Sequence, residues 1–330
     1  MGPSRLLLFI ASGLVLFLQP AQGTLSLDYY DKTCPQFSSI IEQVVTQKQL
    51  SFPTTAAAAL RLFFHDCMVD GCDASVLISS TAFNKAERDA DINLSLPGDA
   101  FDLIAKAKTA VELQCPAVVS CADILAVATR NLVTMVGGPY YKVALGRRDS
   151  QESDASKVEP NLARPTMPLS KIISMFSSKG LSVQEMVALV GAHTIGFAHC
   201  KEFSDRIFNY SKESQSDPSM YGVYAERLRK LCENYTTDSA MSAFNDVMTP
   251  GKFDNMYYRN LKRGLALLSS DQALVDDERT KPFVDLYAAN ETSFFEAFAD
   301  AMDKVSVLNV KTGKEGEIRR RCDQFNASPA

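Results

Sequence analysis

Apolar residues recur mostly three and four positions apart along this chain, and few stretches alternate apolar with polar residues. The first spacing puts apolar side chains on one face of a helix, whereas alternation would put them on one face of a strand. The pattern predicts helices at residues 38–49, 54–67, 100–113, 120–136, 169–179, 182–192, 254–263, 276–289 and 293–307. Short strands are expected only at residues 142–145 and 266–268. The predicted fold class is therefore mainly α, with few short strands.

Residues that begin or end helices stand at several of these limits. Gly137, Gly180 and Asn290 each follow a predicted helix and can adopt the left-handed conformation found at helix ends. Ser182 and Glu185 have the spacing of a capping box, which sets the start of one helix.

The N-terminal residues have the composition of a secretory signal peptide. Arg5 precedes an apolar run at residues 6–18, and small residues lead to Thr24. The run is shorter than the roughly 20 residues that span a membrane, and no later run is longer. We therefore expect a signal peptide at residues 1–23 and an exported chain from residue 24. No repeat, low-complexity tract or long linker divides that chain, which leaves one large domain or two lobes.

The charge balance limits the class of partner. The chain has 34 Lys and Arg residues against 39 Asp and Glu residues, and loss of Arg5 changes the net charge from −5 to 33 − 39 = −6. An acidic chain is a poor match for nucleic acid or for an anionic membrane surface. Small molecules are the expected partners, and the protein is expected to be a monomer.

Eight cysteines indicate disulfides in an exported chain, because the secretory pathway is oxidising. They are Cys34, Cys67, Cys72, Cys115, Cys121, Cys200, Cys232 and Cys322. Zinc is the alternative, but only one close pair is present and the chain has only three histidines. Spacing alone leaves roughly a hundred possible pairings.

Two predicted helices carry a histidine among apolar residues. Arg61 and His65 lie four positions apart on one face, and His193 lies on the buried stripe at the end of another helix. Gly191 and Ala192 before His193 are expected to leave room for a flat partner. Taken singly, each histidine is more simply interpreted as a core residue with a satisfied hydrogen bond.

Oxygen-bearing residues follow His65 closely. Asp66, Gly71, Asp73 and Ser75 supply carboxylates, a hydroxyl and loop carbonyls, the ligands that calcium prefers. A solvated acidic loop explains the same residues equally well.

Seven motifs in order along the mature chain carry a family resemblance: YDKTCP at 30–35, RLFFHDC at 61–67, GCDAS at 71–75, VSCAD at 119–123, LGRRD at 145–149, GAHTIG at 191–196 and FDN at 253–255. On these motifs the chain resembles the class III secretory plant peroxidases. The resemblance implies the haem peroxidase fold, two helical lobes enclosing a haem, as a single domain at residues 24–330. It implies an enzyme that reduces hydrogen peroxide while oxidising small aromatic donors.

The resemblance also implies a role for each residue around the haem. His193 would be the axial ligand of haem b iron, and Asp271, otherwise readable as a helix cap, would accept a hydrogen bond from it. His65 would be the acid and base for peroxide, Asn93 would fix its tautomer, and Arg61 would stabilise developing negative charge.

Two calcium sites and four disulfides are implied in the same way. The distal calcium would take Asp66, Val69, Gly71, Asp73 and Ser75, with Glu87 acting through water. The proximal calcium would take Thr194, Asp246, Thr249, Lys252 and Asp254. The implied disulfides are Cys34–Cys115, Cys67–Cys72, Cys121–Cys322 and Cys200–Cys232.

One departure concerns the donor. The family usually has Asn-Leu-Pro-x-Pro, whereas residues 161–165 read Asn-Leu-Ala-Arg-Pro, so Ala163 replaces the proline whose carbonyl helps to hold aromatic donors. The sequence does not identify the physiological donor.

Sequons for N-glycosylation occur at Asn93, Asn209, Asn234, Asn290 and Asn326, and the role implied for Asn93 argues against a glycan there. An extracellular location, in the wall or apoplast, is expected.

Two other functions compete with a peroxidase. A secreted serine hydrolase would need a nucleophile on a sharp turn, and the chain has no G-x-S-x-G. A non-catalytic wall module would keep the disulfides and calcium without a working haem. The joint presence of Arg61, His65, Asn93, His193 and Asp271 counts against the second.

Overall fold

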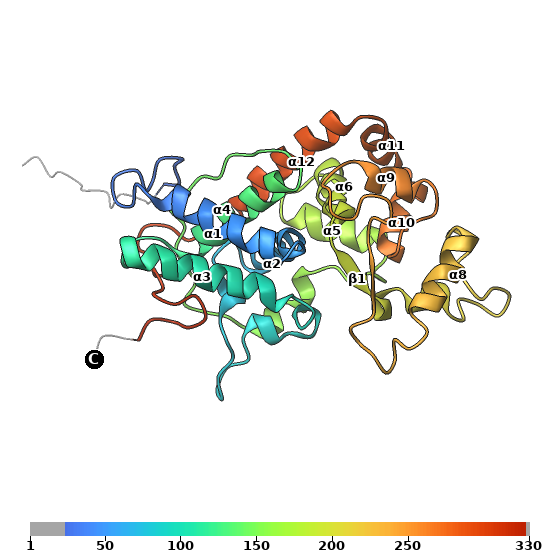
Figure 1. Ribbon diagram of the computed structural model, residues 1–330, viewed down its shortest axis with the longest axis horizontal. Coiled ribbons are helices and arrows are strands. Elements are labelled where there is room, and N and C mark those ends of the chain that lie inside the picture. The colour runs from blue at the N-terminus through green and yellow to red at the C-terminus, as the bar shows by residue number, and fades with distance from the viewer. Residues whose placement is uncertain (1–23, 328–330) are drawn as a thin grey trace, which may run out of the picture.

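The computed structural model describes residues 24–327, and the predicted signal peptide at 1–23 lies outside these described residues (Figure 1). The described α-helices are α1 Phe37–Ser51, α2 Thr55–Val69, α3 Gly98–Gln114, α4 Cys121–Met135, α5 Leu169–Ser178, α6 Val183–Val190, α7 Ser204–Ile207, α8 Gly222–Leu231, α9 Met256–Leu261, α10 Ser269–Asp276, α11 Lys281–Ala289 and α12 Glu291–Ser306. Turns of 3-10 helix that position the site are η1 Ser75–Leu77, η3 Asp91–Asn93, η5 Glu159–Asn161 and η6 Gly191–Thr194. The mainly α prediction is confirmed.

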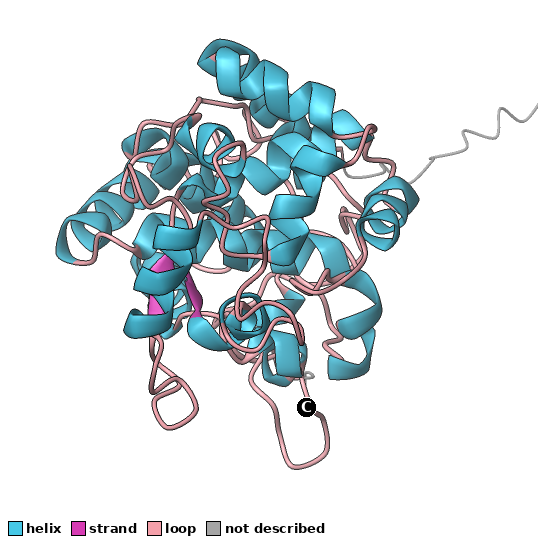
Figure 2. Ribbon diagram, turned by 90° about the vertical axis from the view of Figure 1, so that its right-hand side faces the viewer, coloured by secondary structure: helices cyan, strands magenta, loops and turns pink. Residues whose placement is uncertain are grey.

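The helices form two groups that one long helix joins. Helices α1 to α4 pack against one another, and α5, α6, α9, α10 and α11 form the other group. Helix α12 packs against α6 and α11 in the second group and against α2 in the first. One buried core extends from Tyr30 to Cys322 through both groups, and a smaller core surrounds the Cys200–Cys232 disulfide. Figure 2 shows the described strands as a short pair among helices.

Both predicted strands are wrong. At 142–145 only Leu145 pairs, in an isolated bridge to Ser26. At 266–268 the chain is irregular, and Arg206 Nη1 donates to the carbonyls of Ala266 and Leu267 at 2.7 and 2.9 Å. The buried guanidinium of Arg206 thus donates the hydrogen bonds that a neighbouring strand would otherwise donate. The apolar pattern of the sequence does not reveal such a contact.

The described strands are β1 Phe197–His199 and β2 Ser242–Phe244. They pair antiparallel, with Ala198 opposite Ala243. At three residues each, they are too short for an alternating pattern to be read from the sequence.

Several helix limits differ from the prediction. The helix expected at 276–289 is α11, which begins only at Lys281 with Pro282 in its first turn, and α10, which ends at Asp276, was not predicted. Asn290 is extended at φ −137°, and its side chain accepts from the Ser293 N–H, so it begins α12 and does not end α11 in the left-handed conformation. Gly137 and Gly180 do adopt positive φ, at 99° and 77°.

The capping box at the start of α6 is present. The Ser182 side chain accepts from Glu185 N–H, and the Glu185 carboxylate accepts from Ser182 N–H. Helix α8 was not predicted, because only Tyr224, Ala225 and Leu228 of its ten residues are buried and its mean character is polar.

The eight cysteines form four disulfides, which are the pairs implied by the family resemblance: Cys34–Cys115, Cys67–Cys72, Cys121–Cys322 and Cys200–Cys232. No cysteine among the described residues is free. The Cys121–Cys322 disulfide ties the start of α4 to the C-terminal segment, 201 positions later. Such long closures are worth about 2–4 kcal/mol each, so the cysteines are used for stability and not for zinc.

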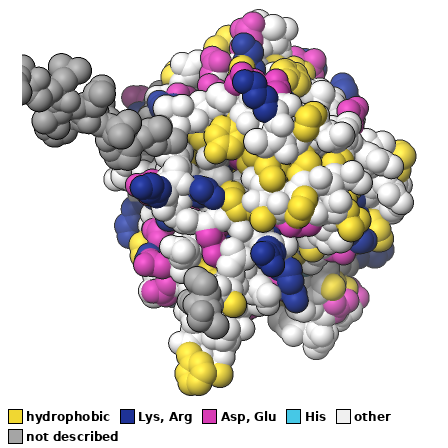
Figure 3. Space-filling model, turned by 90° about the vertical axis from the view of Figure 1, so that its left-hand side faces the viewer, with side chains coloured by type: hydrophobic (Ala, Val, Ile, Leu, Met, Phe, Trp, Pro, Cys, Tyr) yellow, Lys and Arg dark blue, Asp and Glu magenta, His cyan; other side chains and the backbone are white. Residues whose placement is uncertain are grey.

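The surface of the described chain matches its mixed composition. On the face shown in Figure 3, basic and acidic side chains are interspersed. No helix formed by residues 24–327 is long and apolar enough to cross a membrane.

Gly191 serves helix packing and not the approach of a flat partner. A Cβ at Gly191 would overlap Tyr258 Oη and would lie 2.6 Å from Phe294 Cε2. Tyr258 donates to the carbonyl of Val187 at 2.8 Å, so α9 and α12 close against the end of α6 at this residue. The room expected on the basis of this glycine is filled by protein.

We therefore predict that Gly191→Ala destabilises the fold by about 1–3 kcal/mol, because Tyr258 and Phe294 are fully buried and must move. Urea unfolding followed by circular dichroism measures the change. Gly251→Ala is the matched control, since nothing lies within 4 Å of its added Cβ. Equal stability of the two variants would contradict this packing role.

Candidate active site

Helix α2 and turn η3 hold the distal histidine. His65 Nδ1 lies 2.6 Å from Asn93 Oδ1, and Asn93 Nδ2 donates to the Glu87 carbonyl at 2.8 Å. Because the amide NH₂ of Asn93 is committed to that carbonyl, its oxygen faces the ring and Nδ1 must carry the proton. Nε2 of His65 is therefore the basic nitrogen. Asn93 is 2% exposed, which leaves its sequon inaccessible.

Arg61 lies beside His65 without a carboxylate partner among the described residues. Its Nε is 3.3 Å from His65 Nε2, and its Nη1 and Nη2 donate to Ser95 O and Ser95 Oγ at 2.9 Å each. Ser95 was not foreseen as a site residue, since a serine two positions after Asn93 carries no signal beyond the sequon.

The electrostatics of this pair keep His65 neutral. Burial, together with the charge of Arg61, lowers the pKa of His65 to about 3, and the hydrogen bond to Asn93 opposes that shift only in part. Burial also lowers the pKa of Arg61, yet a guanidinium stays charged at any physiological pH. The distal side therefore presents a neutral base next to a fixed positive charge.

His193 lies in turn η6 and not in the helix predicted to run to residue 192, because α6 ends at Val190. Its Nδ1 is 2.9 Å from Asp271 Oδ2. Asp271 is buried in the first turn of α10, where Leu268 is the N-cap, so the carboxylate serves the imidazole and not the helix end. Tyr257 packs edge-on against the ring, with centroids 6.1 Å apart.

His193 keeps one nitrogen available. Burial lowers the pKa of His193, but the charge and hydrogen bond of Asp271 outweigh it and the pKa is raised. Nε2 has no hydrogen bond within the described residues, and the side chain is 38% exposed although the following residue, Thr194, is buried. A basic imidazole with a free Nε2 is the donor that haem iron requires.

The two histidines lie within electrostatic reach of one distal cation. The charge of Arg61 lowers the pKa of His193 as well as that of His65, although desolvation and Asp271 dominate at His193. Arg61 therefore lies close enough to both histidines to affect the pKa of each.

The distal oxygen ligands predicted for calcium come together. Asp66 accepts from the N–H groups of Ala74 and Val76 at 2.9 and 3.3 Å, and Ser75 Oγ is 3.1 Å from Glu87 Oε2. Burial, together with Asp73, raises the pKa of Asp66 to about 8.

Glu87 is affected in the same way. Burial, with Asp66 and Asp73 nearby, raises its pKa to about 9. Buried carboxylates that repel one another need a cation, and the Lys311 ammonium contacts the outer oxygen of Asp73. Lys179 Nζ donates to the Val69 carbonyl at 3.1 Å. Neither lysine was predicted as part of the site.

The proximal ligands also converge. Thr194 Oγ1 lies 3.5 Å from both the Lys252 carbonyl and Asp254 Oδ1, and Thr249 Oγ1 lies 3.1 Å from Asp254 Oδ1 and 3.3 Å from Asp246 Oδ2. Burial raises the pKa of Asp246, and the charge of Asp254 adds to the effect. This set of hard oxygens suits calcium.

No three His, Cys, Asp or Glu residues in the described part of the chain are grouped so as to hold a metal by themselves. The two oxygen clusters do not depend on such a group, since carbonyls and hydroxyls supply part of each ligand set.

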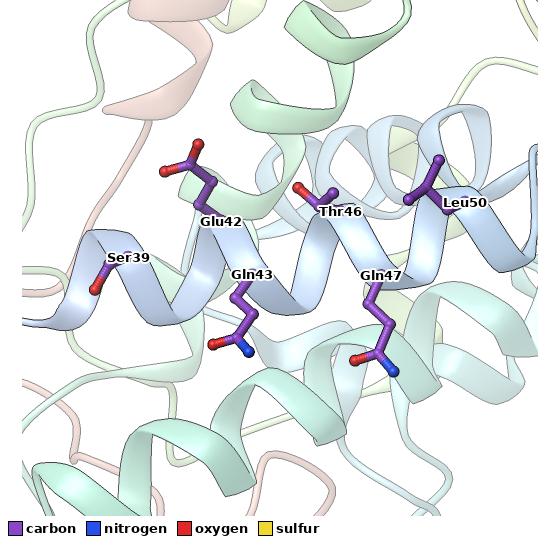
Figure 4. A pocket seen from close by; sticks show the side chains of 6 residues that line it. All are labelled: Ser39, Glu42, Gln43, Thr46, Gln47 and Leu50. Atoms are coloured by element: carbon purple, nitrogen blue, oxygen red, sulfur yellow. The ribbon is translucent and has the colours of Figure 1, made fainter.

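Ala163, predicted to contact donors, lies half-buried between η5 and α5. A surface hollow of about 620 Å³ lies elsewhere, on one flank of α1, lined by Ser39, Glu42, Gln43, Thr46, Gln47 and Leu50 (Figure 4). None of the residues that line it was predicted to take part in function.

Comparison with known proteins agrees with this geometry. The family model described as Peroxidase matches residues 41–290. Peroxidase 6 of Arabidopsis thaliana is 63% identical over 320 residues, covering 95% of this chain and 98% of its own. Peroxidase 65 of the same plant is 61% identical over 302 residues, covering 92% and 89%. Peroxidase 51 is 46% identical over 328 residues, covering 99% of each chain. The chain therefore belongs to the peroxidase family and is a peroxidase enzyme, as its class III motifs predict.

Proposed function

We propose that this enzyme reduces hydrogen peroxide to water and oxidises small aromatic donors by successive one-electron steps, with haem b held at His193. The observation that carries the proposal is that His65 and His193 each have Nδ1 engaged by a buried partner, which leaves Nε2 as the basic nitrogen of each ring. Haem supplies an iron that exchanges electrons with peroxide and with donors.

The distal residues move and stabilise charge. His65 Nε2 takes a proton from the incoming peroxide and returns it to the leaving oxygen, which then departs as water. Arg61, anchored on Ser95, places a permanent positive charge where negative charge develops as the O–O bond breaks. Asn93 keeps the proton of His65 on Nδ1 throughout.

The proximal residues set the strength of the iron ligand. Asp271 accepts from His193 Nδ1, which orients the ring and makes Nε2 more basic. Two calcium ions complete the proposal. One is bound by the cluster of Asp66, Val69, Gly71, Asp73 and Ser75, with Glu87 behind it. The other is bound by the cluster of Thr194, Asp246, Thr249, Lys252 and Asp254.

The remaining elements of the proposal concern the whole protein. We propose a single domain at residues 24–330 after removal of a signal peptide, a monomer, and an extracellular location in the wall or apoplast. The continuous core and the four disulfides support this assignment. Phenolic compounds are the proposed donors, held near the Ala163 carbonyl.

His65→Ala tests the central role. The variant should keep its haem, because His193 and Asp271 are unchanged, while its rate constant for peroxide falls by roughly 10²–10⁴-fold. Stopped-flow mixing with peroxide gives the rate, and the ratio of Soret to protein absorbance gives the haem content. A haem-loaded variant that reacts at the parent's rate would falsify the assigned acid–base role.

The low pKa of His65 predicts the pH dependence. The ring is neutral above its pKa of about 3, so the peroxide rate constant should be level from about pH 5 to about pH 8 and should fall only toward pH 3. Arg61→Gln removes one of the two causes that lower the pKa of His65. In this variant the peroxide rate constant should be smaller, and its decrease at acid pH should begin at a higher pH. A pH-jump stopped-flow series measures both. An acid limb at unchanged pH would show that Arg61 does not tune His65.

Removal of calcium is expected to change the environment of the haem. Thr194 adjoins His193, so loss of the proximal ion should alter the Soret band and lower activity several-fold, and added calcium should restore both. Chelation followed by atomic absorption and visible spectroscopy checks this. If a chain shown to be free of calcium kept its spectrum and its activity, the proposed link between Thr194 and His193 would be wrong.

A further inference from the structure

A segment at residues 159–165, called here the strap, comprises η5 and the residues that follow it toward α5, and Arg164 fastens it to the distal side. Arg164 Nη2 lies 2.7 Å from Asp91 Oδ2 and 2.6 Å from Glu159 Oε1, and its Nε lies 3.1 Å from Glu159 Oε2. Asp91 opens turn η3, which ends at Asn93, the partner of His65. The guanidinium therefore ties the strap to the turn that holds the distal histidine.

The next residue, Pro165, fastens the strap to the proximal side. The Pro165 carbonyl accepts from the Ser270 N–H at 3.0 Å, and Ser270 immediately precedes Asp271, the partner of His193. The Arg164 carbonyl accepts from the Met167 N–H at 2.9 Å, which closes a turn there. The strap thus spans from the distal group of residues to the proximal group.

Ala163 immediately precedes both fastenings and has no support of its own. Its backbone makes no hydrogen bond to any described residue. Leu162 before it is extended, with φ −121° and ψ 137°, and is 1% exposed. The position of the Ala163 carbonyl therefore depends on the buried Leu162 on one side and the Arg164 ion pairs on the other.

We propose that Arg164, through Asp91 and Glu159, is a positioning residue for the donor site, doing with ion pairs what a proline ring at residue 163 would do by fixing the backbone. This inference rests on the proposed function, in which the Ala163 carbonyl contacts the donor. It assigns to this chain a specificity determinant that acts on the donor step and not on the peroxide step.

The solvent exposure of the Arg164 ion pairs limits how strongly they can affect the donor KM. The side chains of Arg164, Asp91 and Glu159 are 39%, 73% and 45% exposed. Single exposed pairs contribute little, but a forked guanidinium on two carboxylates is stronger than an isolated pair, and salt screens it. We expect effects of about two- to fivefold in donor KM, decreasing as ionic strength rises.

The test compares Arg164→Gln with Lys262→Gln in the haem-loaded enzyme. Lys262 makes an exposed ion pair with Asp285 at 2.7 Å, so its loss matches the charge change at a distance from the strap. Arg164→Gln should raise KM for phenolic donors about two- to fivefold at low salt, with kcat and the peroxide rate constant within twofold of the parent. Lys262→Gln should change none of the three.

Hydrogen exchange gives a readout that does not depend on activity. In Arg164→Gln the Met167 and Ser270 amides, which are bonded to Arg164 and Pro165, should exchange faster, whereas Lys262→Gln should leave them unchanged. If the enzyme did not oxidise phenolic donors, hydrogen exchange would still report on the strap. If exchange rose and no donor KM changed, the strap would be real and the specificity role would be overturned.

Rescue by proline separates positioning from a general loss of stability. The extended Leu162 is in the conformation that a following proline requires, and the Ala163 N–H has no acceptor to lose. Ala163→Pro should therefore be tolerated, and Ala163→Pro with Arg164→Gln should return donor KM to within twofold of the parent. A double variant as impaired as Arg164→Gln alone would overturn the proposal.

Discussion

One hydrogen bond at Nδ1 of each site histidine is the constraint on which the rest of the site depends. Asn93 takes that bond at His65 and Asp271 takes it at His193, and both partners are buried. The two partners differ in charge, and the difference decides the chemistry. A neutral amide together with the charge of Arg61 leaves His65 a neutral base, whereas a carboxylate raises the pKa of His193, as the iron ligand that we propose requires.

The residues around each site histidine link it to a cluster of buried oxygens. Asn93 is fixed by the carbonyl of Glu87, a residue that also faces the distal oxygen cluster through Ser75. Thr194, next to His193, belongs to the proximal oxygen cluster. Each histidine is thus connected within a few bonds to one of the two oxygen clusters that we propose to bind calcium.

Much of this could be predicted from the sequence, and the failures have physical causes. Helices with an apolar face, the capping box at Ser182 and the class III motifs all carry local signals. The strand expected at 266–268 failed because a distant residue, Arg206, satisfies its carbonyls. Gly191 was expected to leave room for a flat partner, but Tyr258 of α9 and Phe294 of α12 occupy that space. Arg164 was not foreseen, because its carboxylate partner Asp91 lies 73 positions earlier in the chain and only the fold brings them together.

The central claim is that a haem-loaded chain with a neutral distal base and a carboxylate-backed iron ligand reacts with peroxide. The absorption spectrum of the purified protein, recorded before and after one equivalent of hydrogen peroxide, tests this most directly. The account predicts a Soret band that changes at once on addition and returns when a phenolic donor is supplied. A protein without a Soret band, or with one that peroxide leaves unaltered, would contradict it.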